Sequence, residues 1–240
     1  MFTLYKKEIN AFFSSLTGYI VVAVFLLSVS LFMWVFPGQM NILDNGYASL
    51  DTLFFLAPWL FLFLIPAITM RSFAEERSSG TLEQLLTRPL SSLHIVVAKY
   101  TACLSVVLVA LLPCLVYYYS IYVLGCPQGN IDSAGTVGSF MGLFFLAAAY
   151  SAAGIFASSM SSNQVVSFIV AVVLSFILFT GFDYIGSMAG KAELFVRSLG
   201  INYHYESMSR GVIDSRDILY SLSVVAILLS LTKTVIENKR

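Results

Sequence analysis

LFFLAPWLFLFLIPAITM (residues 53–70) is followed directly by RSFAEERSSGTLEQLLTRPLSSLHIVVAK (residues 71–99), and this junction decides the fold. The second stretch is a polar island, since it holds four of the 13 Lys and Arg residues and three of the 13 Asp and Glu residues. Another apolar run, YTACLSVVLVALLPCLVYYY (residues 100–119), follows it. A charged side chain costs roughly 2.5–3.5 kcal/mol at the centre of a bilayer. The polar island is therefore predicted to lie outside the lipid, between two spans.

The composition is that of an integral membrane protein. Of the 240 residues, 58% are hydrophobic and 11% are charged, and the mean hydropathy is +0.86. Charged residues make up about 25% of an average soluble protein. The net charge is zero, and the basic residues are scattered without aromatic interleaving, which argues against nucleic-acid binding. We therefore predict a single all-α membrane domain over residues 1–240, surrounded by the lipid bilayer.

Six apolar runs are long enough to cross the roughly 30 Å hydrocarbon core of a membrane. The predicted spans are residues 18–36, 52–70, 100–124, 137–157, 165–180 and 218–235. Residues 1–17 place apolar side chains at helical spacing with charged ones between them, which predicts an amphipathic helix in the membrane interface. Gly138 and Gly142 form a GxxxG pair, which permits close helix approach. Residues 184–217 form the longest segment outside the spans.

The Lys and Arg residues indicate the orientation of these spans. If both termini are cytoplasmic, nine of the 13 basic residues lie inside and four lie outside. The four outer residues all fall in the segment 184–217, and the other two outer loops contain none. Cytoplasmic loops of membrane proteins carry an excess of Lys and Arg. The distribution therefore predicts that both termini are cytoplasmic.

Within the polar island, residues 80–88 are predicted to form a short helix. Leu82, Leu85 and Leu86 fall on one face of it. Arg88 and Pro89 would end it, because the residue before a proline disfavours helical backbone angles. For an arbitrary membrane protein, a solvated loop is the simpler interpretation of such a stretch. The order of residues here is more specific.

Phe73, Glu75-Glu76, Gly80-Thr81, Glu83, Leu85-Leu86 and Pro89 together resemble the cytoplasmic coupling-helix segment of ABC-2-type permeases. These are the membrane subunits of one class of ATP-binding-cassette exporters. The resemblance implies an ATP-binding cassette subunit on the cytoplasmic face and a second permease copy or paralogue. The residues that would contact the ATPase are Glu75, Glu76, Arg77, Gly80, Thr81, Leu82, Glu83, Leu85, Leu86, Arg88 and Pro89.

A later segment, residues 202–218, is similar to the "FxxFxxGVIDxxD" region of the same permeases, with Tyr203 and Met208 where Phe is commoner. With the coupling segment, it makes the chain most similar to the gliding-motility-associated branch of the family in bacteria. For that branch the resemblance implies an auxiliary membrane protein with a large periplasmic part. It also implies a location in the bacterial cytoplasmic (inner) membrane.

No catalysis by this chain is expected. Residues 186–191 superficially look like a phosphate-binding loop, but three residues separate the glycines instead of four, and Ala192 stands where Ser or Thr must bind magnesium. An aspartyl intramembrane protease needs two facing carboxylates, and only Asp183 lies near a span. We predict no cofactor and no metal. Cys103 and Cys114 are expected to be buried, Cys126 to be a free thiol, and no disulfide to form within the chain.

Two other functions remain open from the sequence. One is a secondary transporter or channel that acts alone, although the spans contain almost none of the charged residues that ion-coupled carriers use. The other is a membrane anchor that serves the assembly of a larger complex without transport. The sequence does not indicate the substrate. The permease subunit of an ATP-driven exporter is the function that we predict.

Overall fold

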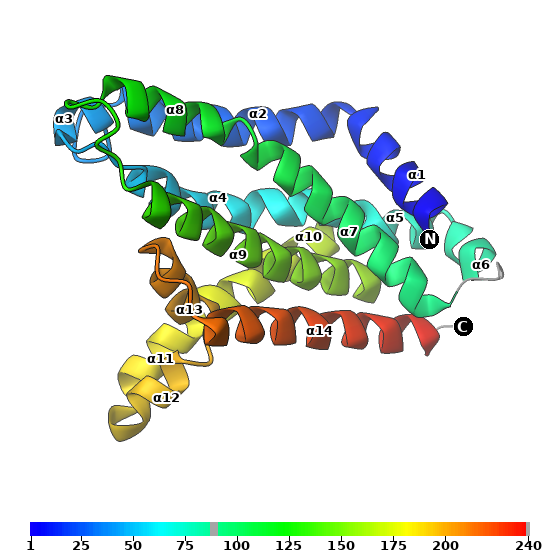
Figure 1. Cartoon of the computed structure of the whole chain (residues 1–240). Helices are drawn as coiled ribbons and strands as arrows, with labels where there is room; N and C mark the ends of the chain where they lie inside the picture. The colour runs from blue at the N-terminus through cyan, green and yellow to red at the C-terminus, as the bar shows by residue number, and fades with distance from the viewer. Residues whose placement is uncertain (87–90, 239–240) are drawn as a thin grey trace.

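The chain is helical throughout in the computed structural model, which describes residues 1–86 and 91–238 (Figure 1). Helices make up 82% of the structure, and no strand occurs in the part described. Within that part, six helical segments are long and apolar enough to cross a membrane: Leu16–Val35, Asp51–Ser78, Ser92–Leu124, Ser133–Met160, Gln164–Met188 and Ser215–Glu237. The predicted fold class, an all-α membrane protein with six spans, is confirmed.

The first half of the chain contains eight α-helices and one π-helical turn. They are α1 (Phe2–Phe13), α2 (Leu16–Ser30), the π-helical turn η1 (Leu31–Val35), α3 (Ile42–Asn45), α4 (Asp51–Thr69), α5 (Arg71–Ser78), α6 (Thr81–Leu86), α7 (Ser92–Leu111) and α8 (Cys114–Leu124). The polar island does not begin as a loop, because α5 follows α4 after the single residue Met70. The second membrane segment therefore continues as helix to Ser78, eight residues into the polar island.

The third membrane segment begins earlier than predicted. It was expected from residue 100, but α7 begins at Ser92, where the Ser91 hydroxyl accepts the amide hydrogen of His94 as a helix N-cap. Within this segment Leu112 and Pro113 separate α7 from α8, since proline has no amide hydrogen and its ring disrupts the preceding turn. Cys103 in α7 is buried and Cys126, beyond α8, is exposed, as expected.

The second half of the chain contains α9 (Ser133–Met160), α10 (Gln164–Phe176), the π-helical turn η2 (Ile177–Gly181), α11 (Phe182–Met188), the short 3-10 turn η3 (Gly190–Ala192), α12 (Glu193–Arg197), α13 (Ile201–Ser209) and α14 (Ser215–Glu237). The fifth span, predicted to end at residue 180, continues through η2 into α11. Asp183 does not end this helix. Its carboxylate accepts a hydrogen bond of 2.8 Å from the side-chain amide of Asn202 and so joins α11 to the start of α13.

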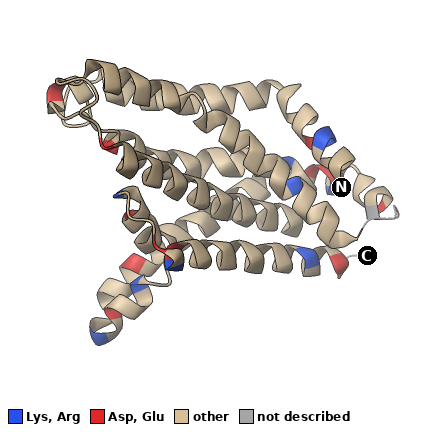
Figure 2. Ribbon diagram, viewed as in Figure 1, with Lys and Arg blue, Asp and Glu red and all other residues tan. Residues whose placement is uncertain are grey.

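Both ends of the described chain lie at the same end of the bundle, beside α5 and α6 (Figure 1). We call this the terminal end, and the opposite end, with α3 and α11–α13, the far end. Lys, Arg, Asp and Glu residues gather at these two ends, and the middle of the long helices carries almost none (Figure 2). This distribution is the one expected for a protein whose middle lies in hydrocarbon, where charged side chains are costly.

Helix α9 is the most buried of the six membrane segments and lies at the centre of the bundle (Figure 1). Its small residues let neighbouring helices approach closely. A Cβ atom added to Gly138 would lie 2.9 Å from backbone atoms of Gly211, and one added to Gly142 would lie 2.9 Å from Cβ of Met208. Gly138 and Gly142 of the predicted GxxxG pair therefore allow α9 to pack closely against the segment that contains α13 of the same chain.

The segment predicted as a long outer loop, residues 184–217, is largely helical. Its helix α13 packs against α9, with Ile201, Tyr205 and Met208 buried. The Tyr205 hydroxyl donates a hydrogen bond of 2.6 Å to the carbonyl of Phe54 near the start of α4. Burial raises the pKa of this phenol, which therefore remains a neutral donor. The far end is thus fixed to the bundle by hydrogen bonding as well as by packing.

The N-terminal helix α1 packs against α7. Leu4 is buried, and the Tyr5 hydroxyl lies 2.9 Å from the Ser105 hydroxyl of α7. On another side of α1, Phe2 is 76% exposed within the chain, and Leu16, the first residue of α2, is 77% exposed. These exposed apolar side chains are available to lipid. The helix therefore has one side on the protein and another side open to its surroundings.

We predict that Gly142→Val destabilises the fold, because the added side chain must push α13 away from α9. Overpacking of this kind costs about 1–3 kcal/mol, so the melting temperature of the purified protein should fall by several degrees. Ala134→Val adds similar bulk at an exposed position of the same helix and serves as the control. Equal melting temperatures for the two variants would contradict the close α9–α13 contact.

Candidate functional site

Helices α5 and α6 form a short hairpin at the terminal end of the bundle (Figure 1). Gly80 lies between them with φ of 69°, a left-handed conformation that favours glycine because it has no Cβ. Thr81, the first residue of α6, donates its hydroxyl to the carbonyl of Glu76 at 3.2 Å and so joins the two helices. Since α5 follows α4 after one residue, the hairpin is an extension of the second membrane segment.

The leucines of α6 face the bundle more than was predicted. Leu82 and Leu85 are half-buried and pack against the main hydrophobic core. Thr81 and Glu83 are exposed. A six-residue helix is too short to be stable by itself. Contact of Leu82 and Leu85 with the core helps to hold α6 in place, so these two side chains are only partly available to another protein.

The junction of α4 and α5 is stabilised by the side chain of Ser158 from α9. The Ser158 hydroxyl accepts hydrogen bonds from the amides of Phe73 and Ala74, at 3.0 and 3.1 Å, and donates one to the carbonyl of Met70 at 3.0 Å. The first amides of a helix have no partner within that helix. A hydroxyl has one hydrogen to donate and two lone pairs. Ser158 therefore uses its full hydrogen-bonding capacity at this junction.

One helical turn before Ser158, Gly154 makes room for the last turn of α4. A Cβ atom at Gly154 would lie only 2.0 Å from the Thr69 hydroxyl oxygen. The Thr69 hydroxyl itself donates to the carbonyl of Ile65 at 3.0 Å and is fully buried. Gly154 and Ser158 are four residues apart and so share one face of α9. That face holds the point where the membrane segment becomes the hairpin.

Lys99 of α7 is buried at the base of the hairpin. Its side chain is 1% exposed, and its ammonium lies 3.0 Å from Oε1 of Glu8, 2.9 Å from Oε1 of Glu76 and 2.7 Å from the carbonyl of Ser72. These three acceptors match the three hydrogens of an ammonium group. The nitrogen also lies 5.2 Å from the centroid of the Phe73 ring, within cation–π range.

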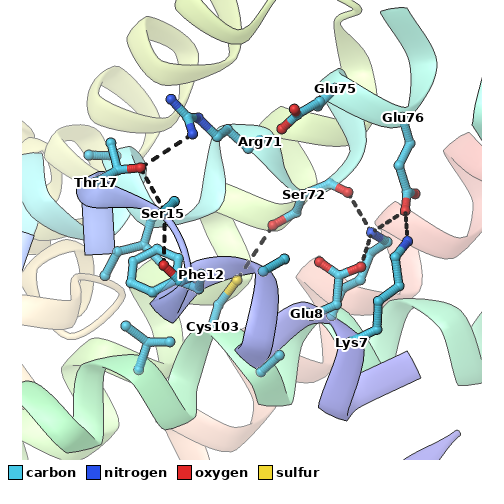
Figure 3. A pocket seen from close by; sticks show the side chains of 16 residues that line it. Lys7, Glu8, Phe12, Ser15, Thr17, Arg71, Ser72, Glu75, Glu76 and Cys103 are labelled. Carbon is cyan, nitrogen blue, oxygen red and sulfur yellow. Dashed lines mark hydrogen bonds and ion pairs between the residues drawn. The ribbon is translucent and has the colours of Figure 1, made fainter. Parts of the chain in front are cut away.

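These contacts join three parts of the chain through one charge (Figure 3). Glu8 belongs to α1, Glu76 to α5 and Lys99 to α7, and we call this group the Lys99 cluster. Lys7 adds a fourth charge at 3.5 Å from Oε1 of Glu76. A buried ion pair is costly to break, because removal of one partner leaves an uncompensated charge in low dielectric. The N-terminal helix and the hairpin are therefore held on the same site of α7.

The structure brings together only some of the residues expected to contact an ATPase. Glu76 is in the Lys99 cluster, and Arg77 donates to the carbonyl of Met160 at 3.1 Å, at the end of α9. Glu75 and Glu83 are exposed. Leu86 ends α6, and Arg88 and Pro89 lie outside the described residues. Glu76 and Arg77 thus hold the hairpin on the bundle.

The sequence analysis did not predict that Lys99 is buried or that Ser158 forms hydrogen bonds at the α4–α5 junction. Lys99 was assigned to the polar island and therefore to the outside of the lipid. Its immediate surroundings, IVVAK at residues 95–99 followed by YTACL, contain no other charge. A lone lysine in such apolar surroundings was the available signal for a buried ion pair, although Glu76, one of its partners, had been assigned to the ATPase contact. Ser158 gave no such signal, because serine is common in helices of this kind.

The contacts of Ser158 and the Lys99 cluster connect the hairpin to α1, α7 and α9, and in the described residues they form no recognisable catalytic site. Among residues 1–86 and 91–238, no group of three His, Cys, Asp or Glu side chains is placed to hold a metal ion. Within the Lys99 cluster, the ammonium of Lys99 has three acceptors, whereas Oε2 of Glu76 is buried without a partner in the described residues.

Comparison with known families gives one match. The family model described as ABC-2 family transporter protein matches residues 41–199, well over half of the 240-residue chain. The match includes the hairpin, α9 and Ser158, and ends before α13. A search of curated proteins finds no matching relative. Permeases of this family are membrane-spanning transporter components that typically work with an ATP-binding subunit and are not themselves the ATPase.

We predict that Ser158→Ala loosens the start of α5, because two amides and one carbonyl lose their partner. Each unpaired buried group costs about 1–3 kcal/mol, so hydrogen exchange at Phe73 and Ala74 should become at least tenfold faster. Ser120→Ala removes an exposed hydroxyl that bonds only within its own helix and is the control. Unchanged exchange at both amides would show that Ser158 does not hold this junction.

Lys99→Met should destabilise the protein by about 3–5 kcal/mol, because it leaves Glu8 without its cation and Glu76 with only the longer contact to Lys7. If the ion pair causes this loss, the double variant Lys99→Met with Glu76→Gln should recover part of it, since one uncompensated charge is removed. Thermal unfolding of the purified proteins measures both effects. A double variant that is less stable than Lys99→Met alone would contradict the pairing.

Proposed function

Because the chain belongs to the ABC-2 family of transporter proteins, we propose that it is the membrane-spanning permease subunit of an ATP-driven exporter, with the α5–α6 hairpin as the coupling element. The observation that carries the proposal is the position of the hairpin. It extends the second membrane segment at the terminal end and is fixed to α1, α7 and α9 by the Lys99 cluster and Ser158. A force on the hairpin therefore reaches the membrane segments.

In this proposal both termini and the hairpin face the bacterial cytoplasm, where ATP is available. Their common position at the terminal end supports a shared side of the membrane. The excess of Lys and Arg near that end supports the cytoplasmic assignment. The four basic residues of the segment 184–217 lie at the far end and are external in this orientation.

The exposed side of α6 is the surface proposed to contact the ATP-binding subunit. Leu82 and Leu85 are half-buried in the permease, so we assign them mainly to holding α6. The exposed carboxylate of Glu83 then becomes the stronger candidate for direct contact. Closure of two ATP-binding subunits would move the hairpin, and the membrane segments would follow as packed units. Switching between two packed arrangements is a common mode of transport-related motion.

The remaining partners are proposed from the sequence resemblance. A second permease copy or paralogue would complete the transport path, since two ATP-binding subunits require two hairpins. The gliding-motility assignment, with its auxiliary membrane protein, depends on the segment 202–218, which lies beyond the residues matched by the family model. In the structure this segment contains α13 and the N-cap of α14, where the Asp214 carboxylate accepts the amide of Arg216.

Glu83→Arg should release the ATP-binding subunit and leave the permease folded, because the side chain is exposed and makes no ion pair within the described residues. Removal of a central contact at an interface costs about 2 kcal/mol or more, a loss of roughly thirtyfold in affinity. Arg216→Glu reverses an exposed charge at the far end and is the control. Co-purification of the ATPase with tagged permease gives the comparison.

If Glu83→Arg retains the ATPase at the level of Arg216→Glu, the exposed side of α6 is not the contact. If no ATPase co-purifies with the unaltered permease from native membranes, the function is better described by a transporter or channel that acts alone. Stimulation of the ATPase without any substrate movement would favour the assembly anchor.

The orientation is tested by single cysteines placed in a variant without Cys103, Cys114 and Cys126. Cysteines at Ser133 and Ser187, both exposed at the far end, should react with a membrane-impermeant maleimide on intact spheroplasts. A cysteine at Ser79, exposed in the hairpin, should react only after the membrane is opened. Reaction at Ser79 in intact cells without reaction at the other two positions would reverse the orientation.

A further inference from the structure

A cavity of about 380 Å³ lies between α1, the α4–α5 junction and α7, beside the Lys99 cluster (Figure 3). Its floor is apolar and includes Ile68, Ala102 and Val106. One wall comes from the end of α1, the link to α2 and the start of α2, with Phe12, Ser15 and Thr17. This cavity is not part of the proposed contact with an ATPase, because α6 contributes none of its lining.

The charges around the cavity are balanced. Three cationic side chains and three carboxylates line it: Lys7, Arg71, Lys99, Glu8, Glu75 and Glu76. A bound anion or a bound cation would leave an excess of one sign in a partly enclosed site. A ligand that carries both charges would not. The balance therefore favours a zwitterionic ligand.

Two of these groups are free to bind such a ligand. Arg71 makes one side-chain hydrogen bond, of 3.3 Å, to the Thr17 hydroxyl, which leaves most of its five donors available. The Glu75 carboxylate makes no ion pair or hydrogen bond within the described residues. Figure 3 shows Arg71 and Glu75 on the same side of the cavity, one turn apart on α5. They can therefore hold opposite charges of one small group.

The exposed Glu75 carboxylate calls for a hydrogen-bond donor. Glu76 is less available, because its Oε1 binds Lys99 and Lys7 and its Oε2 is buried. A primary ammonium group has three hydrogens and can donate to Glu75. A trimethylammonium group has no N–H and cannot.

The cavity also lies where a membrane lipid would present its headgroup. It is located where the apolar run of α4 ends and the charges of α5 begin, and where α1 leads into the first membrane segment. Leu16 and Ile20, at the start of α2, are 77% and 48% exposed and offer an apolar surface beside the cavity. Acyl chains can follow this surface while the headgroup enters the cavity.

We propose that this cavity binds the headgroup of a phospholipid with a primary ammonium group, of the phosphatidylethanolamine type. The phosphate pairs with Arg71, and the ammonium donates to Glu75. Such a lipid lies against α5 beside the Lys99 cluster, in a cavity that α1 also lines. The proposal is independent of which side of the membrane the hairpin faces and of any ATPase.

Binding is tested with the full-length permease, purified in detergent and stripped of lipid. Native mass spectrometry measures the affinity for phosphatidylethanolamine, phosphatidylcholine and phosphatidylglycerol with identical oleoyl chains. Phosphatidylethanolamine should bind about tenfold more tightly than phosphatidylcholine, because a hydrogen bond to a charged group contributes about 1.5–3 kcal/mol and tenfold corresponds to about 1.4 kcal/mol. Glycerophosphoethanolamine, the same headgroup without acyl chains, should bind more weakly than the lipid.

Glu75→Gln should remove the preference for phosphatidylethanolamine over phosphatidylcholine. Arg71→Gln should weaken the binding of both lipids, because both carry the phosphate, and Arg216→Gln, at the far end, should change neither. Melting temperatures measured in detergent alone show that the variants are folded. Equal affinity for phosphatidylethanolamine and phosphatidylcholine would overturn the proposal, as would tighter binding of phosphatidylglycerol, a preference that survives Glu75→Gln, or unchanged binding of both lipids by Arg71→Gln. If glycerophosphoethanolamine binds as tightly as phosphatidylethanolamine, the cavity holds a soluble ligand and the proposal of a lipid is wrong.

Discussion

The Lys99 cluster is the interaction on which the terminal end of the molecule depends. A lysine that is 1% exposed in a helix of a membrane protein must be neutralised by groups brought to it from elsewhere in the chain. Glu8 comes from α1 and Glu76 from α5, and the carbonyl of Ser72 fills the third position. One buried charge thereby determines where the N-terminal helix, the hairpin and the third membrane segment meet.

Helix α9 supports the same site from the other side. Its glycines and serines have small side chains, so α4, α5 and α13 can pack close to it. Ser158 accepts hydrogen bonds from the Phe73 and Ala74 amides at the α4–α5 junction. The far end uses a related pairing, since the His204 ring lies 2.7 Å from the Asp217 carboxylate and joins α13 to α14. Polar contacts are thus concentrated at the two ends of the bundle, and close packing of small residues connects them.

The broad architecture could be predicted from the sequence because it depends on composition and on the length of apolar runs. The short helix in the polar island and its leucines were also visible as a local pattern. The burial of Lys99 could not be predicted, because the sequence does not show whether a lysine is solvated or paired with a carboxylate far away in the chain. The helical form of residues 184–217 was missed for a similar reason: contacts of Tyr205 with α4 and of Gly211 with α9 join positions far apart in the chain.

In the proposed exporter, the hairpin and the membrane segments move as one connected unit when the ATP-binding subunit binds nucleotide. Hydrogen exchange of the purified complex, compared with and without a non-hydrolysable ATP analogue, tests this most directly. We predict coordinated changes in α6, in the amides of Phe73 and Ala74, and in the end of α9 around Ser158. A change confined to α6, with α5 and α9 unaffected, would contradict the account.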